Sequence, residues 1–218
     1  MSDYLVPQQK YLEAGIHIGT KIKTSAVDWF VYKEREDGLY VLDIKKIDER
    51  IAMAAKVLAR YDPSDVVITA SRHYSSIAAL EFGRLTGIKV LQGRYLPGSI
   101  CNLSSKVRIE PKVLFVCDPK GEHQAVIEAG QHGIFTIGLV DTDNTIEYID
   151  FIIPCNNKGK KSLSLIFWIL AREYLLAKGL IKSAEEYDAK ISDFETASGS
   201  EEQTDDSKAS SQEEGSEE

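Results

Sequence analysis

The stretch that decides the fold is "DVVITASRHYSSIAALEFGRLTGIKVLQG", residues 65 to 93. It begins with an apolar run, continues with "SSIAALEFGRLTG", a segment of helical character, and ends with a second apolar run. Near-continuous apolar runs joined by a helix of ten or more residues are typical of parallel strands that are covered on both faces. We therefore predict a strand, a helix and a parallel strand in this stretch.

The same alternation continues along the chain. Three further apolar runs and two helical segments follow, at 112–118, 121–133, 135–141, 148–154 and 163–178. Before the stretch, "FVYKEREDGLYVLD" predicts two short strands joined by a tight turn at Asp37 and Gly38, and Asp43 is placed to cap a helix. The whole pattern predicts an α/β fold, a doubly wound and mostly parallel sheet with helices on both faces.

Charge divides the chain into two parts. The net charge is −8, but residues 184–218 carry thirteen acidic side chains against two lysines, a charge of −11, which leaves +3 for residues 1–183. The last 23 residues contain no aromatic or aliphatic branched side chain, so they cannot bury enough apolar surface to offset the entropy of ordering. We predict one α/β domain over residues 1–183 and a disordered acidic tail over 184–218, whose removal leaves thermal stability nearly unchanged. A tail that repels wrong RNA or binds a basic partner is an alternative.

Cysteine and histidine usage predicts neither a metal nor a redox cofactor. Cys101, Cys117 and Cys155 are odd in number and have no C-x-x-C spacing, and no two of the four histidines are spaced as ligands on one helical face. The N-terminus lacks a charged and apolar leader, and the most apolar stretch, "LSLIFWILA", is too short to span a bilayer. These features predict a soluble, cytoplasmic protein that does not bind a membrane.

Residues 153–162, "IPCNNKGKKS", look at first like a nucleotide-binding loop. A G-x-x-x-x-G-K-[ST] loop needs a first glycine to wrap phosphates and a hydroxyl after its lysine to reach magnesium. Here Pro154 and Lys161 occupy these two positions, and proline also removes a backbone amide. The loop nevertheless brings three lysines to the start of a helix, which predicts a site for the passing phosphates of a nucleic acid.

Several basic clusters fall in segments that we predict to be loops, where a flexible cation can reach a phosphate and an asparagine can donate beside it. We expect little base readout from them. The candidates for contacts with RNA phosphate or sugar are Lys21, Lys23, Arg94, Lys106, Arg108, Asn156, Asn157, Lys158, Lys160 and Lys161.

An enzyme is the main alternative. Asp118, Asp141 and Asp143 follow apolar runs and could hold a metal or a ribose hydroxyl where the strands end. The chain contains no G-x-G-x-x-G, however, and Asp, Asn, Pro and Gly also suit turns and helix caps. We predict no catalytic residue, and a small-molecule enzyme or sensor remains open.

Six stretches occur together in one order: "YLEAGIHIGTK", "DGLYVLDIKKIDERI", "GRYLPGSICN", "EPKVLFVCDPKGEHQAVIEA", "TIGLVDTDN" and "IDFIIPCNNKGKKSLSLIFWILAREYL". Jointly they resemble the small-subunit ribosomal protein two (universal S-two) family, in its archaeal type, over most of residues 4 to 176. The chain lacks the heptad segment that bacterial members insert.

The resemblance implies a flavodoxin-like domain in a structural constituent of the small ribosomal subunit. It implies binding to small-subunit ribosomal RNA and to neighbouring ribosomal proteins, with no catalysis, cofactor or small-molecule substrate. On this basis we expect a cytoplasmic, ribosome-associated protein that acts in translation. An adaptor or cell-surface role without RNA is the remaining alternative.

Overall fold

The computed structural model describes residues 4–102, 104 and 108–196. Its centre is a five-stranded parallel sheet of order β4-β3-β5-β6-β7. The strands are β3 (Val66–Ala70), β4 (Lys89–Gln92), β5 (Val113–Val116), β6 (Phe135–Val140) and β7 (Phe151–Pro154). Numbered from the first strand of the sheet, this is the flavodoxin-like order 2-1-3-4-5, so the predicted fold class is confirmed.

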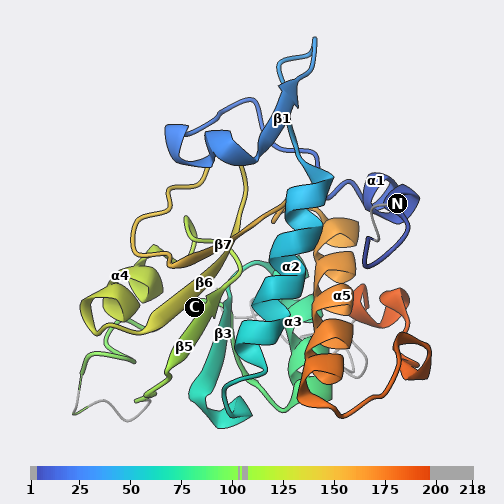
Figure 1. Cartoon of the computed structure of the whole chain (residues 1–218). Coiled ribbons are helices and arrows are strands. Elements are labelled where there is room, and N and C mark those ends of the chain that lie inside the picture. The colour runs from blue at the N-terminus through green and yellow to red at the C-terminus, as the bar shows by residue number, and fades with distance from the viewer. Residues whose placement is uncertain (1–3, 103, 105–107, 197–218) are drawn as a thin grey trace, which may run out of the picture.

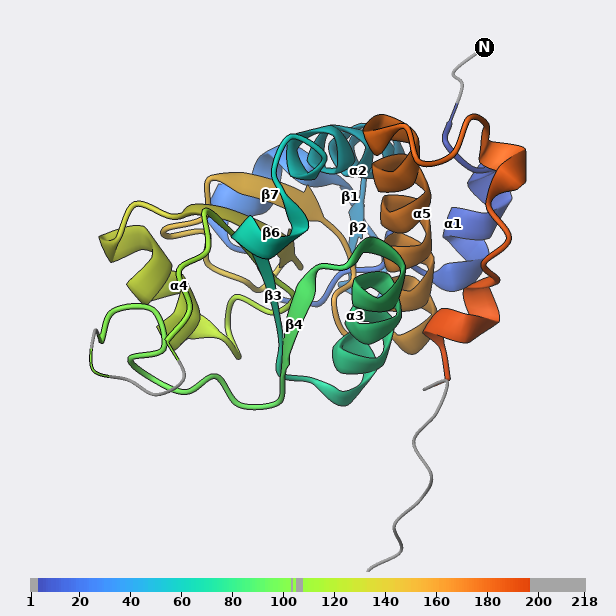
Figure 2. The same cartoon turned by 90° about the horizontal axis from the view of Figure 1, so that it is seen from below.

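Helices cover both faces of the sheet, as predicted. Helices α2 (Ile44–Leu58), α3 (His73–Thr86) and α5 (Lys160–Lys178) pack on one face, and α4 (His123–Gln131) lies on the other (Figures 1 and 2). The alternation of side chains along β3 follows from this, because Val66 and Ile68 belong to the large core under the three helices and Val67 belongs to the smaller core under α4.

The N-terminal part forms a separate layer at one end of the sheet. It contains α1 (Gln8–Ala14), a 3-10 helix η1 (Ser25–Phe30) and an antiparallel pair, β1 (Val31–Glu34) with β2 (Tyr40–Leu42). Gly38 has a φ of 79° in the connecting turn, and the Asp43 carboxylate accepts a hydrogen bond of 3.0 Å from the Lys45 amide at the start of α2. Both local predictions are therefore confirmed.

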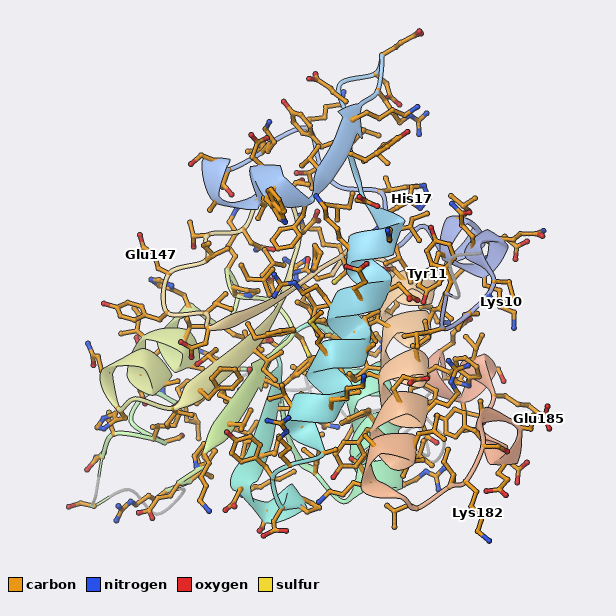
Figure 3. The ribbon with its side chains drawn as sticks, in the orientation of Figure 1. Lys10, Tyr11, His17, Glu147, Lys182 and Glu185 are labelled. Atoms are coloured by element: carbon orange, nitrogen blue, oxygen red, sulfur yellow. The ribbon has the colours of Figure 1, made fainter. Side chains whose placement is uncertain are left out.

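A buried tyrosine fastens α1 to the helical layer. The Tyr11 hydroxyl donates a hydrogen bond of 2.5 Å to Asp48 on α2, and the same carboxylate oxygen accepts one of 3.0 Å from the Leu5 amide. Arg172 on α5 donates to the Leu5 carbonyl at 2.8 Å. Figure 3 shows Tyr11 between α1 and the upper turns of the helical layer. The N-terminus is thereby tied to two helices that are distant in sequence.

Helix α5 begins at Lys160, three residues before the predicted start, and its side chains are buried nearly all round. The cover comes from this chain, because α2 and α3 pack on two sides and residues 184–196 lie along a third (Figure 2). No helix among the described residues is long and apolar enough to cross a membrane.

The predicted domain boundary at residue 184 lies at the start of a segment that packs on α5, so it does not separate the folded part from the rest. Residues 184–196 form two short 3-10 helices, η3 (Ala184–Glu186) and η4 (Ile191–Phe194), and Phe194 is only 1 % exposed. Ser164 donates to the Phe194 carbonyl at 2.9 Å, and the Trp168 indole donates to Ala189 at 2.6 Å. Acidic side chains such as Glu185 face outward (Figure 3). The rest of the predicted tail, residues 197–218, lies outside the described residues.

Candidate nucleic-acid interface

The strand order reverses between β3 and β5, and open α/β sheets commonly bind ligands beyond the carboxyl ends of the strands at such a point. Here the chain fills that place with its own polar groups. Asp118, which follows β5, is almost fully buried, and both the Nε and an Nη of Arg72 lie 2.6 Å from its Oδ2. Gly121 packs against the pair, since a Cβ there would come within 2.9 Å of Asp118.

Glu122 joins the ends of β3 and β5 beneath this pair. Its carboxylate accepts hydrogen bonds from the Thr69 hydroxyl (2.6 Å), the Ser71 amide and hydroxyl (2.8 and 3.0 Å) and the Cys117 amide (3.1 Å). Burial raises the pKa of Glu122 to about 7, although these hydrogen bonds act in the opposite direction. Sequence analysis gave Glu122 no role, because only the tertiary structure brings four donors around it.

Lys158, the first lysine of the 153–162 loop, turns inward. Lys158 Nζ lies 3.1 Å from Asp141 Oδ2 and 2.7 Å from Asp143 Oδ1. Burial opposes the charge of Lys158, but the hydrogen bond to Asp143 and the charge of Asp141 outweigh it, so the pKa of the ammonium is raised. Two of the aspartates considered for an enzyme therefore serve as partners of a lysine.

The two asparagines of the loop also have internal partners. Asn157 is fully buried, and its Nδ2 donates to the Leu139 carbonyl (2.9 Å) and to Asn144 Oδ1 (3.1 Å). Asn156 Oδ1 accepts hydrogen bonds of 3.1 Å from the amides of Lys158 and Gly159 just before α5. These contacts fix the shape of the loop and leave the Asn157 amide no access to an RNA.

The N-terminal segment closes the same edge of the sheet over β6 and β7. The Thr20 amide donates to Thr142 Oγ1 at 2.8 Å, the Thr24 amide donates to the Thr142 carbonyl at 3.0 Å, and the Asn156 amide donates to the Ile16 carbonyl at 2.8 Å. Gly19 is required at the closest approach, because a Cβ there would lie 2.5 Å from the Thr142 methyl carbon. The loop that carries Lys21 and Lys23 is thus held against the turn after β6.

The polar groups at this edge do not assemble into a metal site. Within residues 4–102, 104 and 108–196, no group of three or more His, Cys, Asp and Glu side chains could hold a metal ion. Cys117 and Cys155 are fully buried, which raises the pKa of both thiols well above the ordinary range. The acidic side chains of this edge act as internal hydrogen-bond acceptors and ion-pair partners.

The remaining candidates lie at the surface and differ in their partners. Lys23 pairs with Asp28 at 2.5 Å, and Arg108 pairs with Glu110. The candidates that are exposed and have no ion pair with another described residue are Lys21, Arg94, Lys160 and Lys161. Lys106 lies outside the described residues.

The structure brings some of these groups together and separates others. The segment with Lys21 and the start of α5 with Lys160 and Lys161 both flank the turn that follows β6. Arg94 follows β4 at the opposite border of the sheet, and Arg108 belongs to the loop that closes the smaller core under α4. The two groups therefore mark separate regions of the surface.

Replacing Lys158 with alanine tests its internal role. The change is expected to lower the free energy of unfolding by about 2 kcal/mol, because it leaves the buried Asp141 without its ion-pair partner. Urea unfolding followed by circular dichroism measures the effect. Lys160→Ala, which removes an exposed lysine two positions away, is the control and is expected to change stability by less than about 0.5 kcal/mol. Equal stabilities of the two variants would contradict an internal Lys158.

Comparison with known proteins identifies the family. The family model described as ribosomal protein S2 matches residues 104–176. The small ribosomal subunit protein uS2 of Staphylothermus marinus is 47% identical over 193 residues, which is 88% of both chains. The uS2 proteins of Saccharolobus solfataricus (47% identical, 88% of this chain and 84% of the relative) and Methanococcus maripaludis (49% identical, 83% of both chains) are similar to a comparable degree. With this identity over most of its length, the chain belongs to the ribosomal protein S2 family.

Proposed function

We propose that the protein is a structural constituent of the small ribosomal subunit, where it binds small-subunit ribosomal RNA and neighbouring ribosomal proteins during assembly and translation in the cytoplasm. Its relatives carry the name of a small-subunit protein. The observation that supports RNA binding best is the pair of exposed lysines, Lys160 and Lys161, in the first turn of α5.

Two lysines at this position oppose the helix dipole. The first turn of α5 has no acidic residue, and Gly159 supplies no side-chain cap. A cation at the N-terminus of a helix is disfavoured by about 0.3–1 kcal/mol. A bound phosphate reverses this effect, because the free amides and both ammonium groups then face an anion. The passing backbone of an RNA meets this requirement without any loop that wraps a nucleotide.

The other contacts follow from exposure and pairing. Lys21 and Arg94 are free to contact phosphate, and Lys23 and Arg108 can exchange an exposed ion pair, worth about 0–1 kcal/mol, for one. Lys106 stays in the proposed set on its sequence context alone. Asn156, Asn157 and Lys158 act on RNA indirectly, by holding the loop in front of α5 in place.

Protein neighbours are proposed to cover some of the exposed apolar side chains. Leu80 on α3 and Leu180 after α5 are 40 % and 67 % exposed. Large apolar side chains at the surface supply contact area for a partner. Together with the basic loops, they would let one domain bind RNA and protein on different sides.

Replacing both Lys160 and Lys161 with alanine tests the RNA contact. The plot of log affinity for small-subunit RNA against log salt is expected to become shallower by about 0.7–0.9 per lysine, because fewer counterions are released on binding. Lys56→Ala with Arg60→Ala, a double change of equal charge at the other end of the helical layer, is the control. A slope that falls equally in the two double variants, or in neither, would count against phosphate contacts at α5.

A further inference from the structure

A row of cations and aromatic rings lies along the outer side of α2. Lys46 Nζ lies 4.5 Å from the centre of the Trp29 ring and also donates a hydrogen bond to the Trp29 carbonyl. One helical turn later, the Arg50 guanidinium lies 5.4 Å from the Phe30 ring and 5.0 Å from the Phe151 ring. These five residues, from η1, α2 and β7, form what we call the α2 strip. Figure 1 shows β1, which directly follows η1 in the chain, above the upper turns of α2.

Trp29 is the most exposed large apolar side chain of the described structure, at 74 %. The other tryptophan, Trp168, is packed and hydrogen-bonded through its indole. Lys46 contacts Trp29 at both the ring and the backbone, so the ring is supported from one side. A tryptophan ring that is held in place and open to water is the type of side chain that is enriched at contact surfaces.

The positive charges of Lys46 and Arg50 are not neutralised by a carboxylate of the described structure, because neither side chain forms an ion pair within it. Both are half-buried, with the positive group against a ring. A partner that covers Trp29 therefore also meets two positive charges within one helical turn, which favours an anion beside a flat apolar group.

An unpaired nucleotide combines these two properties. In an RNA duplex the base faces are stacked on one another, and the helix presents mainly phosphates and hydroxyls. A base in a loop, bulge or single strand has a free face that can stack on an aromatic ring, while its phosphate reaches a nearby cation. Such stacking tolerates any base, which agrees with the expectation of little base readout.

We propose that an unpaired RNA nucleotide stacks on the open face of Trp29, with its backbone phosphates beside Lys46 and Arg50. This inference rests on the proposed function, because it presupposes an RNA-binding protein. It adds a contact of a different kind from the lysines of α5, since a stacked base contributes affinity that does not depend on counterion release.

Binding of a short single-stranded RNA and of a blunt duplex of equal length, each at low and at physiological salt, tests the proposal. Trp29→Ala is expected to weaken binding of the single strand about 5- to 150-fold, the range for one stacked base, with an unchanged salt slope. Trp29→Phe keeps a ring and should recover most of the affinity. In a Trp168→Phe background, Trp29 is the only tryptophan, and the single strand is expected to quench its fluorescence.

Tyr74→Ala is the matched control, because Tyr74 is an exposed aromatic residue on α3 with no cation over its ring among the described contacts. It is expected to leave both affinities unchanged. If Trp29→Ala behaves like Tyr74→Ala, or weakens duplex binding equally, the stacking proposal is wrong. It is also wrong if Trp29→Ala keeps RNA affinity but blocks entry into the small subunit, since the strip then binds a protein. The proposed function survives these results as long as the change at Lys160 and Lys161 flattens the salt slope; a wild-type protein that binds neither RNA overturns both.

Discussion

Replacing Glu122 with alanine is expected to lower the free energy of unfolding by about 3–5 kcal/mol. The carboxylate is 2 % exposed and accepts hydrogen bonds from two hydroxyls and two backbone amides at the ends of β3 and β5. Removing it leaves four donors in a buried place, and each unsatisfied buried donor costs about 1–3 kcal/mol before water enters. In a domain of this size, the loss corresponds to a fall of about 10 °C in the melting temperature.

Glu122→Gln separates hydrogen bonding from volume. Glutamine fills the space and keeps one acceptor oxygen, but its NH2 group places a donor against the surrounding donors, so a loss smaller than that of Glu122→Ala is expected. Urea unfolding near pH 8, where the wild-type Glu122 is ionised, measures both variants. A Glu122→Ala protein within about 1 kcal/mol of the wild type would show that the donors find other partners, and that this carboxylate does not join the two strands.

The same carboxylate predicts how stability depends on pH. Burial raises the pKa of Glu122 to about 7 in the folded protein from 4.5. Between these values the folded chain holds a proton that the unfolded chain has lost, so the contribution of Glu122 to the free energy of unfolding falls as pH rises and stops changing above about 7. The difference in stability between the wild type and Glu122→Gln is expected to change by about 3 kcal/mol over this window. Parallel pH profiles would contradict a raised pKa.

Deletion of residues 184–218 is expected to destabilise the protein by about 4 kcal/mol or more, in contrast to the expectation from composition alone. The deletion removes Phe194 from the core, and a Phe→Ala change in a core costs about 3–5 kcal/mol by itself. It also removes the acceptors of Ser164 and Trp168 and uncovers one side of α5. Deletion of 197–218 alone is expected to change stability by less than about 1 kcal/mol, because this segment has no large apolar side chain to bury.

Thermal unfolding of the two truncated proteins and of Phe194→Ala measures this difference. Phe194→Ala is expected to reproduce most of the loss that the longer deletion causes. Equal melting temperatures for the two truncated proteins would mean that residues 184–196 do not stabilise the domain.

The sheet could be predicted from the sequence because each strand is a nearly continuous apolar run and each helix has its own periodicity. The helix cap at Asp43 and the turn at Gly38 could also be predicted, because capping and tight turns depend on adjacent residues. Residues 184–196 were not, because a composition average over 35 residues hides Phe194 among acidic neighbours. A short segment becomes part of a domain through a few buried side chains, whatever its net charge.

The candidate interface was less predictable than the fold. Lys158 and Lys160 are two positions apart where the loop meets α5, yet Lys158 is paired with Asp141 and Lys160 is exposed. The direction of a loop side chain depends on tertiary neighbours, so the spacing in the sequence does not reveal it. The exposure of Trp29 could not be predicted either. An apolar residue beside a strand commonly lies in the core, and only the structure places this one at the surface.

The central claim is that this protein belongs to the small ribosomal subunit and is held there by salt-sensitive contacts with RNA. Sedimentation of a lysate of the source organism through sucrose gradients at low and high salt, with the protein followed by an antibody, tests it most directly. We predict that the protein travels with the small subunit at low salt and is released as salt rises, because lysine and arginine contacts with phosphate weaken steeply with salt. A protein that stays at the top of the gradient at every salt concentration would contradict the claim.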